Sequence, residues 1–141
     1  MNAGLKTTLY LLAGFFLVMQ LAPYGREHSN PPVVSEPSWP DAESRALAER
    51  ACYDCHSNET EWPWYSNIAP ISWLLTKHVE DGRDEVNCSV WEDCGGCTHG
   101  EFKEVLLGGE MPLPSYLILH PEARLTDAER AQLLGALESL P

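Results

Sequence analysis

The chain has 141 residues, about the size of one ordinary domain. It carries 21 acidic and 9 basic residues, a formal net charge of −12, and every Asp and Glu lies after residue 26. This charge argues against nucleic acid as a partner and favours transient docking onto a basic patch of another protein.

The first 24 residues form an apolar leader. Lys6 precedes an apolar run, residues 9–22, that only Gln20 interrupts. The run is shorter than the about 20 residues of a typical membrane span, and no clear Ala-x-Ala cleavage site follows it, so an uncleaved anchor and a cleaved signal both stay open. We favour an N-terminal membrane helix, because a short helix can tilt and Tyr24 suits a membrane interface. Lys6 then places the rest of the chain outside the cytoplasm.

Residues 25–40 have the composition of an extended spacer. Pro, Ser, Asn and Glu dominate, and four prolines forbid a continuous helix: Pro31, Pro32, Pro37 and Pro40. His28 lies here and is expected to be solvated. The chain thus divides into a leader (1–24), a spacer (25–40) and one domain (41–141).

Helical patterns dominate residues 41–141. The first predicted helix starts at Ser38 or Asp41 as cap and runs to Cys52. The second starts at Pro70, ends at Gly82 and places apolar side chains and one histidine on a stripe: Ile71, Leu74, Leu75, His78 and Val79.

Two more helices are predicted near the C-terminus. One runs from Glu101 to Leu107 and stops at Gly108. The last begins with a capping box from Thr126 to Glu129, ahead of a stripe of leucines. No strand-like alternation is present, so we predict an all-α fold with long loops at 57–69 and 110–126.

The segment Cys52-Tyr53-Asp54-Cys55-His56 is a complete C-x-x-C-H, the attachment pattern of c-type haem. Its two thiols can bond the two vinyl groups on one edge of the porphyrin, and the histidine that follows can ligate the iron. A chance match, or a redox or zinc C-x-x-C, is the alternative. Export supports haem, because bacteria attach haem c after export. We predict one covalent haem c held by Cys52, Cys55 and His56.

A ligand on the other face of the iron is expected from Met111. It lies in Gly109-Glu110-Met111-Pro112, a loop whose glycine and proline allow close approach and then stiffen the path. Sulfur ligation raises the reduction potential. A gap-filling Met in the core is the alternative, and His78 and His120 compete for the same iron position.

An aromatic group follows the motif. Trp62, Trp64 and Tyr65 are expected to line the flat macrocycle and to keep water from the iron. A plain hydrophobic core is the alternative interpretation.

Four motifs occur here in one order: C-x-x-C-H-S-N, W-P-W-Y-S, I-A-P-x-S-W-L and E-M-P-x-P-x-Y. From about residue 31 to the C-terminus, the chain resembles the haem-binding domain family of small exported bacterial proteins. The resemblance implies a cytochrome c-like helical domain, a single covalent haem and, in most members, an N-terminal membrane helix. It also implies that Cys52 and Cys55 hold the haem, that His56 is proximal, and that Met111 stands at the family's Met position.

The chain departs from this family between residues 87 and 100, where three further cysteines occur. Cys88, Cys94 and Cys97 suggest one disulfide and one remaining thiol, and the pairing stays open. The stretch from Cys94 to His99 misses a second haem motif by one residue, so we expect only one haem.

These patterns predict a non-enzymatic mono-haem c-type cytochrome with no catalytic residues. It would lie on the periplasmic side of the bacterial inner membrane, anchored by its N-terminal segment, and carry single electrons between redox partner proteins. One alternative is a haem sensor or peroxidase-like domain with an open sixth position. Another is a structural zinc module built from Cys52, Cys55, Cys94 and Cys97.

Overall fold

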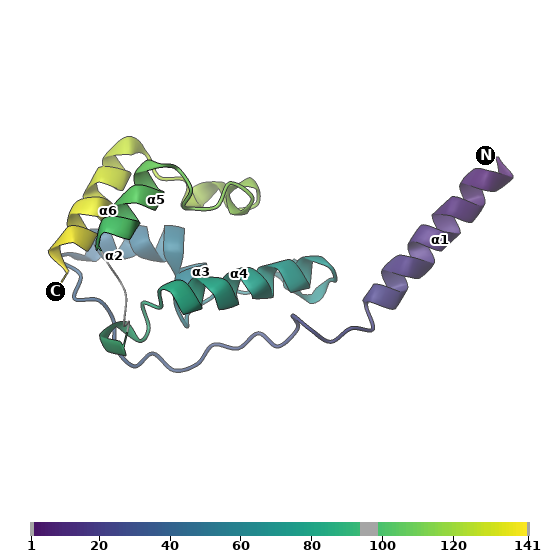
Figure 1. Ribbon diagram of the computed structural model, residues 1–141, viewed down its shortest axis with the longest axis horizontal. Coiled ribbons are helices and arrows are strands. Elements are labelled where there is room, and N and C mark those ends of the chain that lie inside the picture. The colour runs from purple at the N-terminus through teal and green to yellow at the C-terminus, as the bar shows by residue number, and fades with distance from the viewer. Residues whose placement is uncertain (1, 94–98, 141) are drawn as a thin grey trace. The chain divides into compact units, whose positions relative to one another are not determined.

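The computed structural model of the protein describes residues 2–93 and 99–140, and this part contains helices and no strand (Figure 1). The prediction of an all-α fold is therefore confirmed for the described residues. The α-helices are α1 (Ala3–Met19), α2 (Ala42–Ala48), α3 (Asp54–His56), α4 (Ile71–Glu85), α5 (His99–Leu107) and α6 (Asp127–Ser139). A π-helix, η1 (Glu49–Tyr53), and four 3-10 turns complete the set: η2 (Trp64–Asn67), η3 (Trp91–Asp93), η4 (Tyr116–Ile118) and η5 (Pro121–Ala123).

The chain forms two compact units. The first consists of Met1–Ser29 and Trp62–His78, and the second of Asn30–Glu61 and Val79–Pro141. Helix α4 begins in the first unit and ends in the second. The division predicted from composition, into 1–24, 25–40 and 41–141, stays a prediction.

In the first unit, the N-terminal segment is bound to the chain around α4. The Gln20 side-chain amide donates to the Ala69 carbonyl at 2.8 Å and accepts from the Ala69 N–H at 3.0 Å. His28 stacks on Trp62, with ring centroids 4.7 Å apart, and its Nε2 lies 2.9 Å from the Ser66 hydroxyl. The expectation that His28 is solvated is therefore wrong, because a stacked ring and a polar partner hold it.

Helix α1 is apolar and exposed along its length. It has 17 residues, whereas a membrane span needs about 20. No helix within residues 2–93 and 99–140 is long and apolar enough to cross a membrane, so the predicted N-terminal membrane helix is not supported.

In the second unit, three helical segments follow one another without a break and carry the chain to His56. Asp41 caps the first, α2, by accepting the Ser44 N–H at 2.7 Å, so of the two predicted caps Asp41 is the one used. The π-helix η1 then carries Cys52, and α3 carries Cys55 and His56. Single π turns inside α-helices occur often at functional sites.

Helices α2, α5 and α6 pack together in this unit (Figure 1). The predicted capping box of α6 is present, with the Thr126 hydroxyl accepting the Glu129 N–H and the Glu129 carboxylate accepting the Thr126 N–H. The leucine stripe of α6 is buried with residues of α2, α5 and η1 in one core: Leu47, Ala48, Ala51, Tyr53, Cys88, Leu106, Leu125, Leu133, Leu137 and Leu140.

Helix α4 differs from its prediction at its end. It continues through Gly82 to Glu85, so Gly82 is not the stop that the sequence suggested. A Cβ on Gly82 would lie 2.6 Å from the Cys55 carbonyl oxygen. The glycine therefore serves close packing inside a helix. Of the predicted stripe, Val79 is buried, but Ile71 and Leu74 are 43 % and 53 % exposed.

Candidate haem-attachment site

The two cysteines of the C-x-x-C-H segment lie on consecutive turns of the helical segment that ends at His56. Neither Cys52 nor Cys55 is in a disulfide, and Cys88, which is buried nearby in the core, is bonded to neither of them. Burial raises the pKa of the Cys52 thiol to about 12, with Cys55 adding to the shift. Burial also raises the pKa of Cys55 to about 11. Both sulfurs are thus unbridged and protonated at neutral pH, and a thioether bond can form only at a sulfur that is not in a disulfide.

His56 is held in one tautomer. Its Nδ1 lies 2.8 Å from the Gly82 carbonyl oxygen and 3.2 Å from that of Val86. Carbonyl oxygens only accept hydrogen bonds, so Nδ1 carries the proton and Nε2 keeps its lone pair. Burial lowers the pKa of His56 against the opposing effect of these two hydrogen bonds, which keeps the ring neutral. This is the state in which imidazole ligates a metal.

The approach of α4 to the motif depends on Gly82. Its α-carbon lies so near Cys55 that an added Cβ would meet the carbonyl oxygen at 2.6 Å and the carbonyl carbon at 3.0 Å. The same close approach brings the Gly82 carbonyl to the His56 ring. The sequence predicted this glycine only as the end of the helix, and its role as support for His56 was missed.

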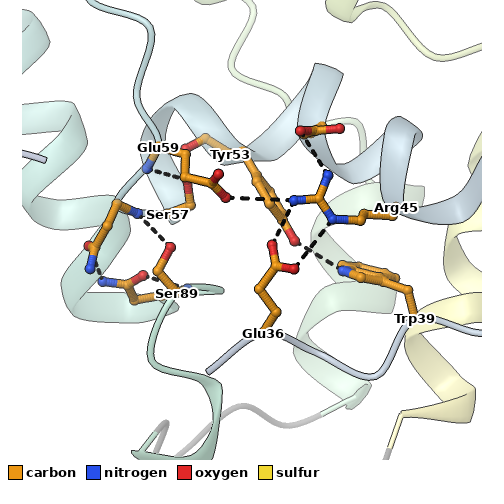
Figure 2. A network of polar contacts seen from close by, with 10 residues as sticks. Glu36, Trp39, Arg45, Tyr53, Ser57, Glu59 and Ser89 are labelled. Atoms are coloured by element: carbon orange, nitrogen blue, oxygen red, sulfur yellow. Dashed lines mark hydrogen bonds and ion pairs between the residues drawn. The ribbon is translucent and has the colours of Figure 1, made fainter. Parts of the chain in front are cut away.

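Tyr53, inside the motif, belongs to a network of polar contacts (Figure 2). Tyr53 is 2 % exposed, and its hydroxyl accepts the Trp39 indole N–H at 3.0 Å. Arg45 lies 5.7 Å from the centroid of the Tyr53 ring and pairs with three carboxylates: Glu36 at 2.8 Å, Glu49 at 2.8 Å and Glu59 at 3.8 Å. The hydrogen bonds that Arg45 donates to Glu36 and then to Glu49 raise the pKa of Arg45, so its charge is permanent. These contacts hold the hydroxyl and the ring of Tyr53 in one orientation.

The residues just after the motif are bound to a second segment of the chain (Figure 2). The Ser57 hydroxyl donates to the Tyr53 carbonyl at 2.7 Å, and the Asn58 N–H donates to the Ser89 hydroxyl at 2.9 Å. The Cys88 N–H donates to the His56 carbonyl at 2.7 Å. Ser57 and Asn58 of the C-x-x-C-H-S-N motif therefore hold the chain as it leaves the attachment site.

Met111 follows a tight turn at the end of α5. The Glu110 N–H bonds back to the Val105 carbonyl at 2.9 Å, and Gly109 adopts a φ of +72°, the left-handed conformation that such a helix end requires. Met111 is partly buried and packs against the same hydrophobic core as Cys52. The structure brings these two predicted site residues to one core, and iron ligation by Met111 stays a prediction.

The two competing histidines lie in different units. His120 stacks on Tyr116 with ring centroids 4.2 Å apart, and its Nδ1 lies 3.2 Å from a Glu122 carboxylate oxygen. His78 lies in the first unit on α4 and is half-buried.

The predicted aromatic wall belongs to the first unit. Trp62 stacks on His28, Trp64 is 77 % exposed, and Tyr65 meets Trp64 edge to face at 5.7 Å. Their role around a haem stays a prediction.

The extra-cysteine predictions fall on Cys94 and Cys97, which lie outside the described residues. This holds for the disulfide with Cys88, for a second haem motif and for the four-cysteine zinc module. In the described part of the chain, no group of three or more His, Cys, Asp or Glu side chains is arranged to hold a metal ion.

We compared the sequence with models of known protein families. The haem-binding domain family matches residues 14–138. The chain belongs to the haem-binding domain family. No curated protein and no solved structure matches it. The resemblance drawn from the four sequence motifs is thereby confirmed, and the protein is a haem-binding domain. Its own residues fit the group, because two unbridged thiols and an imidazole with an available Nε2 lie in sequence at the motif.

Proposed function

We propose that this haem-binding domain is a mono-haem c-type cytochrome. Cys52 and Cys55 would hold one haem through thioether bonds, and His56 would ligate the iron through Nε2. The observation that carries the proposal is the hydrogen bond from His56 Nδ1 to the Gly82 carbonyl, inside a C-x-x-C-H whose thiols are free. When bound, the haem supplies a reversible one-electron couple.

The chain's own residues would hold the haem and set its reduction potential. The Gly82 carbonyl fixes the direction of the His56 ring and makes it a stronger donor, because a hydrogen-bonded imidazole N–H raises the basicity of the other nitrogen. Met111 would supply sulfur from the opposite side and raise the reduction potential. We assign no catalytic residue and propose electron transfer between redox partner proteins as the role.

Covalent attachment is tested by expression with periplasmic haem-maturation machinery. The haem should survive denaturing electrophoresis, a pyridine haemochrome spectrum should show haem c, and the intact mass should correspond to one haem. Cys52→Ser together with Cys55→Ser should abolish the haem stain. A double variant that keeps covalent haem would refute the assignment, and a two-haem mass would point to residues 94–99.

Ligation by Met111 is tested with Met111→Ala, and His78→Ala serves as its control. The Met111 variant should lose the weak red-edge absorption of sulfur-ligated ferric haem, lower the reduction potential and bind cyanide faster. The control should change none of these. An unchanged Met111 variant, with a His78 or His120 variant turned high-spin, would show two histidine ligands. An open sixth position in the unmodified protein would favour the sensor or peroxidase-like alternative.

We propose that the protein acts on the periplasmic side of the bacterial inner membrane, with residues 1–24 as the export leader. Lys6 supports this, because a basic residue ahead of an apolar run favours a cytoplasmic N-terminus. Glu27 is the one acidic residue of the first unit, and the other 20 belong to the second. An acidic unit suits a redox partner with a basic docking surface. Protease digestion of spheroplasts should remove the domain, and carbonate extraction should show whether the leader keeps it at the membrane. Protection from protease in spheroplasts would refute export.

A further inference from the structure

The carboxylate of Asp54, which lies between the two attachment cysteines, joins three parts of the second unit. Its Oδ2 accepts the Tyr116 hydroxyl at 2.6 Å, and its Oδ1 accepts the Glu61 N–H at 2.9 Å. The Asp54 main-chain carbonyl also accepts the Thr60 hydroxyl at 2.8 Å. The motif segment is thus bonded both to the chain that follows it and to a loop 62 residues further on.

That distant loop, residues 110–126, is the one that carries Met111. Tyr116 lies on it five residues after Met111, at the start of η4. Two main-chain hydrogen bonds hold the backbone around Tyr116. The Tyr116 N–H donates to the Leu113 carbonyl and the His120 N–H donates to the Tyr116 carbonyl, both at 3.0 Å. The His120 ring covers the Tyr116 ring at 4.2 Å and 7°. The phenol is therefore held firmly in the direction of Asp54.

The hydrogen bond from the Tyr116 phenol to the Asp54 carboxylate is short. An O–H···O⁻ distance of 2.6 Å is typical of charge-assisted hydrogen bonds. Burial, and then this bond, raise the pKa of the Tyr116 phenol, so the proton stays on Tyr116. Both side chains are partly buried, which limits competition from water.

We propose that Tyr116 is a positioning residue that ties the Met111 loop to the haem-attachment segment through Asp54. The loop is fixed at its start by the left-handed turn at Gly109 and, five residues past Met111, by this bond. Only a short length of chain between these two points remains free to move, so the Met111 sulfur keeps one position relative to the motif. The proposal rests on the proposed function, because it assigns Tyr116 to the loop that would supply the sulfur ligand.

The test uses the holoprotein and two measurements. Amide hydrogen exchange across residues 110–120 reports whether the loop is held, and the cyanide-binding rate of the ferric protein reports how often the sulfur leaves the iron. The variants are Tyr116→Phe and Asp54→Ala, with Asp54→Asn as the conservative change that keeps an acceptor oxygen. Ser115→Ala is the control, because Ser115 is exposed beside Tyr116 on the same loop and its side chain makes no cap hydrogen bond.

Loss of a hydrogen bond to a charged group should raise both rates by about tenfold or more in Tyr116→Phe and in Asp54→Ala. The double variant should be no faster than Asp54→Ala alone, because that substitution already removes the bond that Tyr116→Phe removes. Asp54→Asn should keep most of the slow exchange, and Ser115→Ala should match the unmodified protein. If Tyr116→Phe does not fold, Asp54→Ala against Asp54→Asn decides the question without altering the loop.

Two outcomes would overturn the inference. Exchange and cyanide binding within twofold of the unmodified protein would show that the bond does not hold the loop. Faster exchange with unchanged cyanide binding would show a structural tie without a positioning role. Failure of the proposed sulfur ligation itself is recognised separately, because Met111→Ala would then leave the absorption spectrum and the cyanide rate unchanged.

Discussion

Gly82→Ala is the substitution whose effect the structure determines most directly. The added Cβ would lie 2.6 Å from the Cys55 carbonyl oxygen and 3.0 Å from the carbonyl carbon and from the Cys55 Cβ. Ordinary contact begins near 3.4 Å, so α4 and the motif segment must separate by about 0.8 Å. The closest atoms belong to the backbone, so no side chain can swing away to relieve the contact.

The expected cost follows from two opposing effects. Overpacking of this kind costs about 1 to 3 kcal/mol, whereas alanine in a helix interior gains about 0.5 to 1 kcal/mol over glycine. Taken at the middle of both ranges, the two effects leave a net loss of about 1 kcal/mol in the free energy of unfolding. The same displacement would take the His56 Nδ1 contact with the Gly82 carbonyl from 2.8 Å out of hydrogen-bond range. A less basic imidazole stabilises ferric iron less, so the reduction potential should rise.

Urea unfolding of the holoprotein, followed by haem absorbance, measures the first effect, and potentiometric titration measures the second. Gly135→Ala is the matched control, because Gly135 lies inside α6 with no atom within 4 Å of an added Cβ. That variant should gain about 0.5 to 1 kcal/mol and leave the potential unchanged. Gly82→Ala that is as stable as the unmodified protein would refute the reasoning that close approach to Cys55 requires glycine.

Three further predictions concern the ends of α5 and α6. Gly109→Ala should cost about 1 to 2 kcal/mol in urea unfolding, because its φ of +72° strains any residue with a Cβ although the space around it is open; an unchanged midpoint would contradict this. Thr126→Ala should cost about 1 kcal/mol by loss of the α6 cap, and a stability equal to that of the unmodified protein would show that the cap contributes nothing. Hydrogen bonds from Thr126 and then Arg50 lower the pKa of Glu129 to about 2, so its contribution to stability is present above pH 4.5 and is lost as pH falls from 4.5 through 2. In urea midpoints measured from pH 2 to 7, Glu129→Gln should reduce this loss of stability at acidic pH. The control, Glu138→Gln at the exposed ion pair with Lys103, should leave the loss unchanged. The same loss in both variants would refute the assignment to Glu129.

Features that depend on neighbours within one or two helical turns could be predicted from the sequence. The cap at Asp41, the capping box from Thr126 to Glu129 and the end of α5 at Leu107 all involve atoms three to five residues apart. The C-x-x-C-H pattern is local in the same sense, so five consecutive residues were enough to predict haem as the cofactor. The family match confirms haem binding.

Features that depend on distant neighbours could not be predicted in this way. A glycine that ends a helix and a glycine that lets two segments touch look alike in sequence, and the contact that distinguishes them at Gly82 comes from Cys55, 27 residues earlier. The pairing of Asp54 with Tyr116 spans 62 residues, and that of His28 with Ser66 spans 38. Hydrogen bonds of this range arise from how the chain packs, because periodicity and capping carry no information about which side chains meet across the core.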